Sequence, residues 1–141
     1  MTIGRIIEGR TEVITCDAGT TVRDAAALLA ERRIGAVPVI EDGGLAGIFS
    51  ERDVIYKLRE VGPDVLDMPL KSVMTVTPVT VTPETSVMGA LSLMTRRRIR
   101  HLPVVKDDRM VGIVSIGDLV KYRMDKIEHE AEAMRDYIQT A

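Results

Sequence analysis

Apolar residues follow two patterns along this chain, one typical of helices and one typical of strands. The same order of these segments occurs twice. Apolar positions recur every three or four residues over 22–29 and again over 87–94, which is the spacing of one buried helical face. A second helix is expected to begin at Ser50 and at Ser115, so the order β-α-β-β-α is predicted twice. Short runs rich in Val and Ile predict the strands, at residues 12–15, 37–40 and 45–49 and at 79–82, 102–105 and 110–114.

The two successions are copies of one sequence unit. A shift that places Thr21 on Ser86 aligns 21–54 with 86–119 without a gap, and 13 of the 34 aligned positions are identical. A three-stranded sheet cannot bury both of its faces alone, so the two units are expected to pack on each other. We expect residues 1–70 to hold the first unit with an N-terminal segment and an ordered connector, residues 71–122 the second unit, and residues 123–141 a C-terminal helical extension.

Composition and charge narrow the classes of function. Hydrophobic residues make up 45% and charged residues 28% of the chain, which is typical of a soluble globular protein. The net charge of −2 gives no general attraction for nucleic acid, and no apolar stretch is long enough to span a bilayer. No secretory signal opens the chain, so a cytoplasmic location is expected. The single cysteine, Cys16, lies in an apolar run and is expected to be a core residue.

No arrangement of residues predicts an enzyme or a metal site. The two histidines, His101 and His129, belong to no group with zinc-ligand spacing, and the zincin, nucleophile-elbow and phosphate-loop motifs do not occur. The basic run 96–101 lies at an expected helix end, where the helix dipole favours cations, and no aromatic residue interleaves it for nucleic acid. We therefore predict neither catalytic residues nor metal ligands.

The C-terminal extension carries a heptad stripe of apolar residues, at Val120, Met124, Ile127, Ala131, Met134 and Ile138. A stripe of this length must be buried on something. It can fold back on its own module or pack on a second subunit. We predict a homodimer whose contact includes this helix, because a soluble monomer normally avoids exposing so much apolar surface.

Two motifs resemble those of one known family. The sequences Gly-Ile-Phe-Ser-Glu-Arg-Asp at 47–53 and Gly-Ile-Val-Ser-Ile-Gly-Asp at 112–118 resemble the signature of CBS domains, which are named after cystathionine β-synthase. Segments 34–39 and 99–104 resemble the strand that precedes the signature in that family, and 71–75 resembles the connector before a second repeat. The resemblance implies an α/β (α+β) fold of two CBS repeats related by a pseudo-twofold axis, and it commonly implies a dimer.

The resemblance also implies a function. CBS pairs bind adenosine-containing ligands such as AMP, ADP, ATP, NAD(H) or S-adenosylmethionine in the clefts between their repeats, and they regulate an attached or bound protein. The expected function is therefore a non-catalytic sensor that signals to an unidentified partner through a change in the shape of a dimer. The alternative is a ligand-free interaction module that docks through its C-terminal helix.

The signature has a chemical reason. A Ser-x-x-Asp at a helix start places the carboxylate beside the free N–H groups of the first turn, where it can accept both hydroxyls of a ribose, and the helix N-terminus favours a phosphate. The same pattern is also a capping box, which needs no ligand. Because Arg52 has a glycine as its counterpart, the cleft at Asp53 is expected to be more positive than the cleft at Asp118. The expected ribose and phosphate contacts are Ser50, Arg52, Asp53, Arg100, His101, Ser115 and Asp118.

The repeats differ where a phosphate is expected. Arg100 and His101 stand in the second repeat where the small residues Gly35 and Ala36 leave space in the first. Basic residues at the place of Arg100 hold phosphate in the γ subunit of AMP-activated protein kinase, which this region resembles, and an arginine fork suits phosphate oxygens. The apolar walls for adenine are expected from Ile14, Ile34 and Ile113 in one cleft and from Ile48, Val79 and Ile99 in the other.

Overall fold

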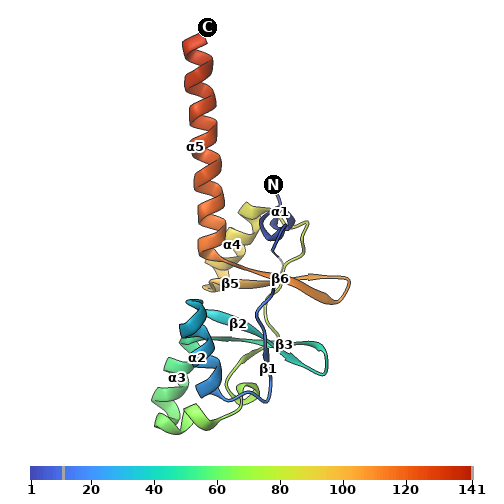
Figure 1. The fold of residues 1–141 in the computed structure, drawn as a ribbon, viewed down its shortest axis with the longest axis vertical. Helices are drawn as coiled ribbons and strands as arrows, with labels where there is room; N and C mark the ends of the chain where they lie inside the picture. Colours follow the sequence, from blue (N-terminus) through green and yellow to red (C-terminus); the bar gives the residue numbers. More distant parts are fainter. Residues whose placement is uncertain (11, 141) are drawn as a thin grey trace.

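The computed structural model describes residues 1–10 and 12–140. The two units lie one above the other along the long axis of the molecule, and a long helix leaves the second unit (Figure 1). The first unit comprises β1 (Cys16–Asp17), α2 (Val22–Arg32), β2 (Ala36–Glu41), β3 (Gly44–Ser50) and α3 (Glu51–Val61), and the second comprises α4 (Val87–Arg97), β5 (His101–Lys106), β6 (Arg109–Ser115) and α5 (Ile116–Thr140). The predicted α/β fold of two repeats with a C-terminal helix is confirmed.

The hairpins of the two units share one register. The β2–β3 pairing starts at Ala36 opposite Ser50, and the β5–β6 pairing starts at His101 opposite Ser115, which are the same positions in the alignment of the two repeats. Each hairpin has one irregularity, after the fourth residue of its first strand. In the first unit, β1 adds parallel to β2 and β4 (Thr75–Val76) adds antiparallel to β3, which completes a four-stranded sheet.

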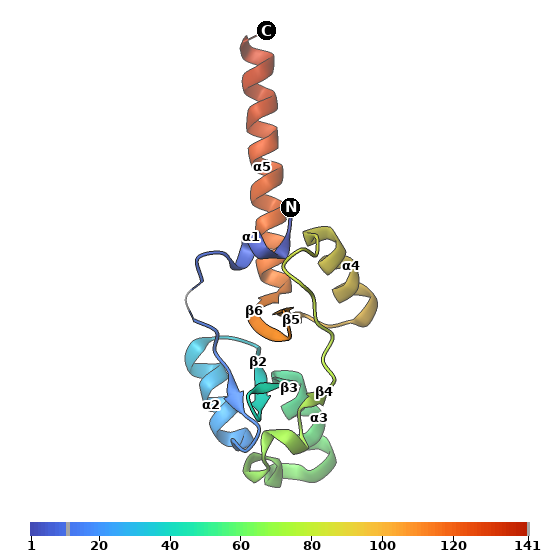
Figure 2. The same ribbon diagram turned by 90° about the vertical axis from the view of Figure 1, so that its right-hand side faces the viewer.

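The opening strand of each unit differs from the prediction. Residues 12–15 form no strand, and β1 covers the next two residues instead. The run 79–82 is reduced to a single parallel bridge between Val81 and Val104. The reason is geometric, because these segments cross from one unit to the other beside the clefts and meet the neighbouring strand only near their ends (Figure 2).

The first helix of each unit begins as predicted. The hydroxyls of Thr21 and Ser86 cap α2 and α4 by accepting the backbone N–H of the third helical residue, at 3.2 and 2.9 Å. Both helices end at an arginine in the left-handed region, Arg33 and Arg98, each with a φ of 54°. The first helices of the two units therefore have equivalent caps at both ends.

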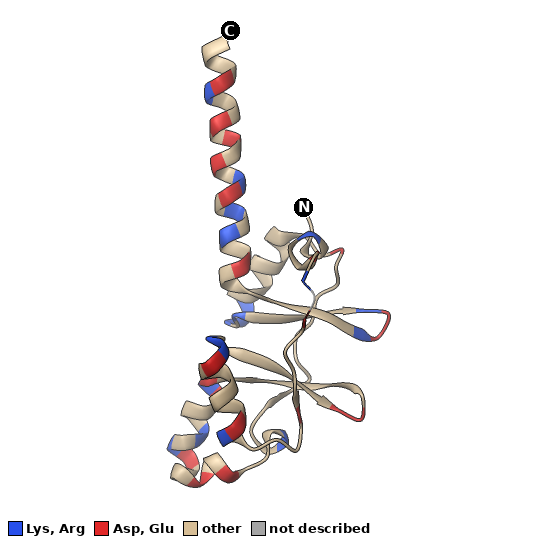
Figure 3. Ribbon diagram, in the orientation of Figure 1, with Lys and Arg blue, Asp and Glu red and all other residues tan. Residues whose placement is uncertain are grey.

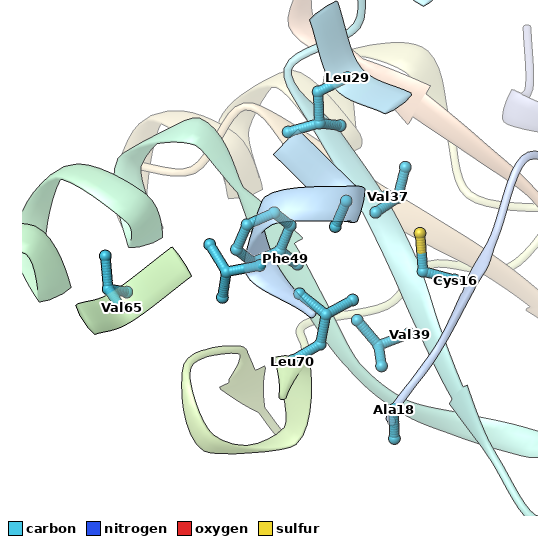
Figure 4. Close-up of a cluster of buried hydrophobic side chains, with 10 residues drawn as sticks. Cys16, Ala18, Leu29, Val37, Val39, Phe49, Val65 and Leu70 are labelled. Atoms are coloured by element: carbon cyan, nitrogen blue, oxygen red, sulfur yellow. The ribbon is translucent and has the colours of Figure 1, made fainter. Parts of the chain in front are cut away.

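Each unit has its own hydrophobic core. In the first core, shown in Figure 4, the fully buried ring of Phe49 lies among aliphatic side chains. Cys16 is buried in the same cluster, and burial raises the pKa of its thiol, so the prediction of a core residue is confirmed. The connector adds the fully buried Val65 and Leu70, so it is ordered as predicted.

The N-terminal segment and the connector pack on different units. The N-terminal helix α1 (Ile3–Ile7) packs on the second unit, where Ile3 is fully buried. The short 3-10 helices η1 (Gly62–Asp67) and η2 (Leu70–Ser72) of the connector pack on the first unit. The N-terminal segment therefore belongs by packing to the second unit, while the division of the chain at residues 70 and 122 stays a prediction.

Helix α5 projects away from both units for most of its length (Figure 1). Beyond Tyr122 most of its side chains are exposed to solvent, and the stripe residues Met124 and Ile127 are 57% and 49% exposed. The alternative in which this helix folds back on its own module is therefore wrong. Among the helices of residues 1–10 and 12–140, none combines the length and the hydropathy of a membrane-spanning segment.

Candidate functional site

Two clefts open between the units, one beside each signature. The Asp53 cleft has a volume of about 350 Å³ and is lined by β3 and α3 of the first unit, by residues 75–79 and by residues 99–103 of the second unit. The Asp118 cleft has a volume of about 440 Å³ and is lined by β6 and α5 of the second unit, by Ile7, Arg10 and residues 12–14, and by residues 33–36 of the first unit. Each cleft takes walls from both units, so a bound molecule would touch both.

The structure brings every predicted site residue to these clefts. The grouping of the apolar walls agrees with the one expected from the sequence, whereas binding by any of these residues stays a prediction. The Asp53 cleft contains Ile48, Ser50, Arg52, Asp53, Val79, Ile99 and Arg100, the Asp118 cleft contains Ile14, Ile34, Ile113, Ser115 and Asp118, and Gly35, Ala36 and His101 line both.

Asp53 completes a capping box at the start of α3. Its Oδ2 accepts the backbone N–H of Ser50 at 2.8 Å and the Ser50 hydroxyl at 3.2 Å. Its Oδ1 lies 3.4 Å from the Thr75 hydroxyl, which is a long contact. Burial raises the pKa of Asp53, although its hydrogen bonds from Ser50 and Thr75 act in the opposite direction. One oxygen is thus anchored, and the other is weakly engaged.

Asp118 has the same anchor but a different second partner. Its Oδ2 accepts the backbone N–H of Ser115 at 2.9 Å, and the Ser115 hydroxyl accepts the backbone N–H of Asp118 at 3.1 Å. Its Oδ1 forms an ion pair with Nη2 of Arg10 at 3.2 Å. The other arm of the guanidinium, Nη1, donates to the carbonyl oxygen of Ile113 at 3.0 Å. A cation therefore stands where the first cleft has a hydroxyl.

The expectation that the Asp53 cleft is the more positive one is wrong. Each cleft is lined by two arginines and two carboxylates, because Arg10 and Arg33 enter the Asp118 cleft together with Glu12. Sequence reasoning missed Arg10 and Glu12 because they lie upstream of the aligned segment 21–54. Extending the same alignment upstream would have placed Arg10 opposite Thr75, which also lines a cleft.

The centre of the module is a contact between Gly35 and His101, which both line both clefts. A Cβ added at Gly35 would lie 3.3 Å from the His101 Cε1, so the glycine leaves room for the imidazole. Burial lowers the pKa of His101, while the charges of Glu51 and Asp118 raise it and that of Arg100 lowers it. Charged groups of both clefts therefore act on the pKa of His101.

Arg52 has a structural contact in addition to its place in the cleft. Its Nη1 donates to the carbonyl oxygen of Arg98 at 3.2 Å, at the C-terminal end of α4. This bond ties the start of α3 to the second unit. Arg100 is an exposed side chain that lines the Asp53 cleft. Figure 3 shows basic residues at the level where the two units meet.

The combination of groups in each cleft fits one kind of ligand. Apolar walls accommodate a flat aromatic base, a carboxylate oxygen accepts the two hydroxyls of a sugar, and an arginine fork accepts a phosphate. The walls come from Ile48, Val79 and Ile99 in the first cleft, next to Asp53 and Arg100.

Comparisons with known proteins agree with this geometry. Residues 3–60 and 70–125 match the CBS domain family. The chain is 40% identical over 129 residues to the mitochondrial CBS domain-containing protein CBSX3 of Arabidopsis thaliana. That alignment covers 88% of this chain and 63% of CBSX3, so this chain spans less than two thirds of the relative's length.

Solved structures show the same architecture. The CBS-domain containing protein ATU1752 from Agrobacterium tumefaciens superimposes with a TM-score of 0.83 at 32% identity, covering 87% of this chain and 99% of that protein. CBSX2, solved in complex with AMP, superimposes with a TM-score of 0.74 at 28% identity, covering 88% of this chain and 96% of CBSX2. This chain therefore belongs to the CBS domain family and is a tandem pair of CBS domains.

Proposed function

We propose that this CBS pair is a non-catalytic regulatory module that binds an adenosine-containing ligand, such as AMP, ADP, ATP or NAD(H), in one or both clefts. The observation that carries the proposal is that each cleft contains one signature aspartate, Asp53 or Asp118, with an equivalent anchor. In each cleft one oxygen is anchored on the backbone N–H of the signature serine, at 2.8 Å for Asp53 and 2.9 Å for Asp118. The second oxygen takes no part in the helix cap; it has a long contact with Thr75 at Asp53 and an ion pair with Arg10 at Asp118, which a ligand would replace. The complex of CBSX2 with AMP supports this class of ligand.

The Asp53 cleft offers a specific pose. The ribose hydroxyls donate to Oδ1 of Asp53, the adenine lies against the apolar wall that includes Ile48 and Val79, and the phosphate points toward Arg100. The cleft volume of about 350 Å³ falls within the range of roughly 300–1,000 Å³ that is usual for small-molecule sites. Both units contribute to this pose, so ligand binding changes how firmly the two units are held together.

The geometry of the signature serines supports a binding role over a catalytic one. A nucleophilic serine needs an adjacent base that a third group orients. Here the Ser50 hydroxyl lies 3.4 Å from the backbone N–H of Asp53 and 3.2 Å from its carboxylate, in a helix cap. The Ser115 hydroxyl accepts a backbone N–H in the same way. Both hydroxyls are engaged in holding helix starts.

We further propose that the signal is transmitted through a homodimer formed along α5. The stripe residues Met134 and Ile138 near the end of the helix are 59% and 66% exposed, so a partner surface is needed to bury them. The occupant that we favour is the same helix of a second copy. In a parallel pair, a g position of one helix meets the e′ position of the following heptad on the other helix.

The charges of α5 fit this parallel arrangement. With the stripe at a and d, Arg123 at g faces the partner's Glu128 at e, and Glu130 at g faces the partner's Arg135 at e. Both pairs are attractive, and the twofold axis repeats each of them. The two CBS pairs of the dimer then lie at the same end of the coiled coil.

A thermal-shift experiment tests ligand binding. AMP, ADP, ATP, NAD, NADH and S-adenosylmethionine are added singly to the full chain and to the double variant Asp53→Ala/Asp118→Ala. A ligand at a hundred times its dissociation constant stabilises the folded state by about 2.7 kcal/mol, so the melting temperature of the wild type rises by several degrees. The double variant is expected to show no rise. If the wild type shows no rise with any of these ligands at millimolar concentration, the sensing function is wrong.

The second candidate function is that of a ligand-free interaction module. The exposed stripe of α5 supports it, because this helix could dock a different protein without any occupied cleft. It predicts no thermal shift together with retained dimerisation or partner binding. The melting-curve experiment therefore separates the two candidates.

A further inference from the structure

The two clefts of this module differ at one atom of each signature carboxylate. Oδ1 of Asp53 meets the neutral hydroxyl of Thr75 at 3.4 Å, whereas Oδ1 of Asp118 meets the guanidinium of Arg10 at 3.2 Å. The other oxygen of both carboxylates is held in the same way in the two repeats. The difference therefore concerns the oxygen that remains for a ligand.

The difference is encoded in the repeat itself. The shift that aligns the two signatures also places Arg10 on Thr75, so these residues occupy equivalent positions. Arg10 is also held by its second arm, which donates to the carbonyl oxygen of Ile113 at 3.0 Å. The chain that leads to Arg10 is fixed on the second unit, because Ile7 packs over Gly112, 3.2 Å from the position of a Cβ there.

The ion pair changes what the Asp118 cleft can accept. A ribose diol that approaches Asp53 displaces one long contact with a neutral hydroxyl, whereas at Asp118 it competes with a charged, two-armed donor. A ligand that carries a phosphate offers the guanidinium another anion, because planar arginine forks bind phosphate oxygens well. Arg33 lines the same cleft and adds positive charge there.

We propose that Arg10 makes the Asp118 cleft selective for phosphate-bearing adenosine ligands, while the Asp53 cleft also accepts the unphosphorylated nucleoside. This inference rests on the proposed ligand-binding function. It assigns Arg10 a specificity-determining role, in which the guanidinium leaves Asp118 for the phosphate when the ligand enters. The N-terminal segment thereby becomes part of the response to the ligand in the second cleft.

Calorimetric titration of the full chain with adenosine and with AMP tests the proposal. The wild type is expected to bind AMP in both clefts and adenosine in the Asp53 cleft. Each binding event is assigned to a cleft by its disappearance in Asp53→Ala or in Asp118→Ala. In Arg10→Ala and Arg10→Gln, the preference of the Asp118 cleft for AMP over adenosine is expected to fall by about tenfold, the scale of one charge-assisted hydrogen bond. The Asp53 cleft should keep its affinities.

Arg23→Ala is the control, because Arg23 forms a more exposed ion pair of similar length, 3.3 Å to Asp67, outside both clefts. Its affinities for both ligands should equal those of the wild type. Equal affinity of the wild-type Asp118 cleft for adenosine and AMP, or an unchanged preference in both Arg10 variants, would overturn the inference and leave the sensing function intact. Failure of every adenosine ligand to bind the wild type would overturn both.

Discussion

The Asp53 carboxylate accepts the backbone N–H of Ser50 at 2.8 Å, so one side chain closes the first turn of α3 and also lines the cleft between the two CBS domains. Capping uses Oδ2, so the proposed ligand binding falls to Oδ1 of the same carboxylate. This explains why the Ser-x-x-Asp pattern alone cannot separate the two roles, and it determines how variants of Asp53 must be interpreted.

Replacing Asp53 by alanine is expected to weaken both roles at once. Loss of a charged hydrogen bond to the ribose should reduce the binding free energy of the Asp53 cleft by roughly 1.5–3 kcal/mol, and loss of the cap should lower the free energy of unfolding by about 1 kcal/mol. Ser86→Ala is the matched control, since it removes the cap of α4 at a position that lines neither cleft. Calorimetry and urea unfolding of both variants are the measurements. Equal affinities in the two variants would reduce Asp53 to a cap.

His101 is expected to make the fold sensitive to mild acid. Burial holds its pKa below the ordinary 6.5, so between 6.5 and the lower native pKa the unfolded chain binds a proton that the folded chain does not. Stability is therefore fully present above pH 6.5 and is lost as the pH falls through the native pKa. Melting temperatures measured between about pH 8 and pH 5 should fall less in His101→Gln than in the wild type. The substitution His129→Gln, at an exposed histidine, serves as the control. A melting temperature that falls with pH as steeply in His101→Gln as in the wild type would contradict the prediction.

The two signature glycines are expected to differ in their tolerance of alanine. A Cβ at Gly47 would lie 2.6 Å from the backbone oxygen of Thr75 and 2.7 Å from the sulfur of Met74, so the connector would have to move. A Cβ at Gly112 would lie 3.2 Å from a terminal methyl group of Ile7, which can shift more easily. Urea unfolding should show a loss of about 1–3 kcal/mol for Gly47→Ala and a smaller loss for Gly112→Ala. A larger loss for Gly112→Ala than for Gly47→Ala would show that the N-terminal segment adapts less easily than the connector.

Truncation after Lys121 is expected to weaken or dissociate the dimer, because it removes the stripe from Met124 onward and leaves both signatures in place. Light scattering on the full and the truncated chains at tens of micromolar measures this. A full-length chain that is monomeric would disprove dimerisation along α5, and a truncated chain that stays dimeric would move the interface to another surface.

The direction of the helices has a separate test. Arg123→Glu should weaken the dimer by placing like charges opposite each other, and the additional change Glu128→Arg should restore it. Sedimentation equilibrium of the single and double variants measures the effect. An Ile138→Cys variant should form a disulfide across a parallel pair under mild oxidation, since the native Cys16 is buried in the first core. A disulfide that does not form, together with a double variant that is not restored, would indicate antiparallel helices.

The repeat made much of the fold and of the candidate site predictable. Copies of one unit in ungapped register constrain each other, so the repeat pattern was enough to predict strands at 37–40 and 102–105, which lie within β2 and β5, helices over 22–29 and 87–94, which lie within α2 and α4, and the positions of both signature aspartates. The apolar walls were grouped correctly for the same reason, because a residue and its copy must lie in equivalent places.

The segments between and before the repeats could not be predicted in this way. Local pattern placed a strand at 12–15, but the backbone there crosses from one unit to the other and meets no strand until Cys16. The equal charge of the two clefts was missed because Arg10 precedes the aligned segment 21–54.

Sequence alone therefore determined the family, the doubled signature and the amphipathic character of the last helix, because these depend on periodicity and on short motifs within one unit. Tertiary structure alone decided that α1 packs on the second unit, that Arg10 near the start of the chain reaches Asp118 in the second signature and that α5 stands clear of its own module. These facts depend on contacts between residues far apart in the chain, and the strength of such contacts is set by burial and geometry, which no local pattern contains.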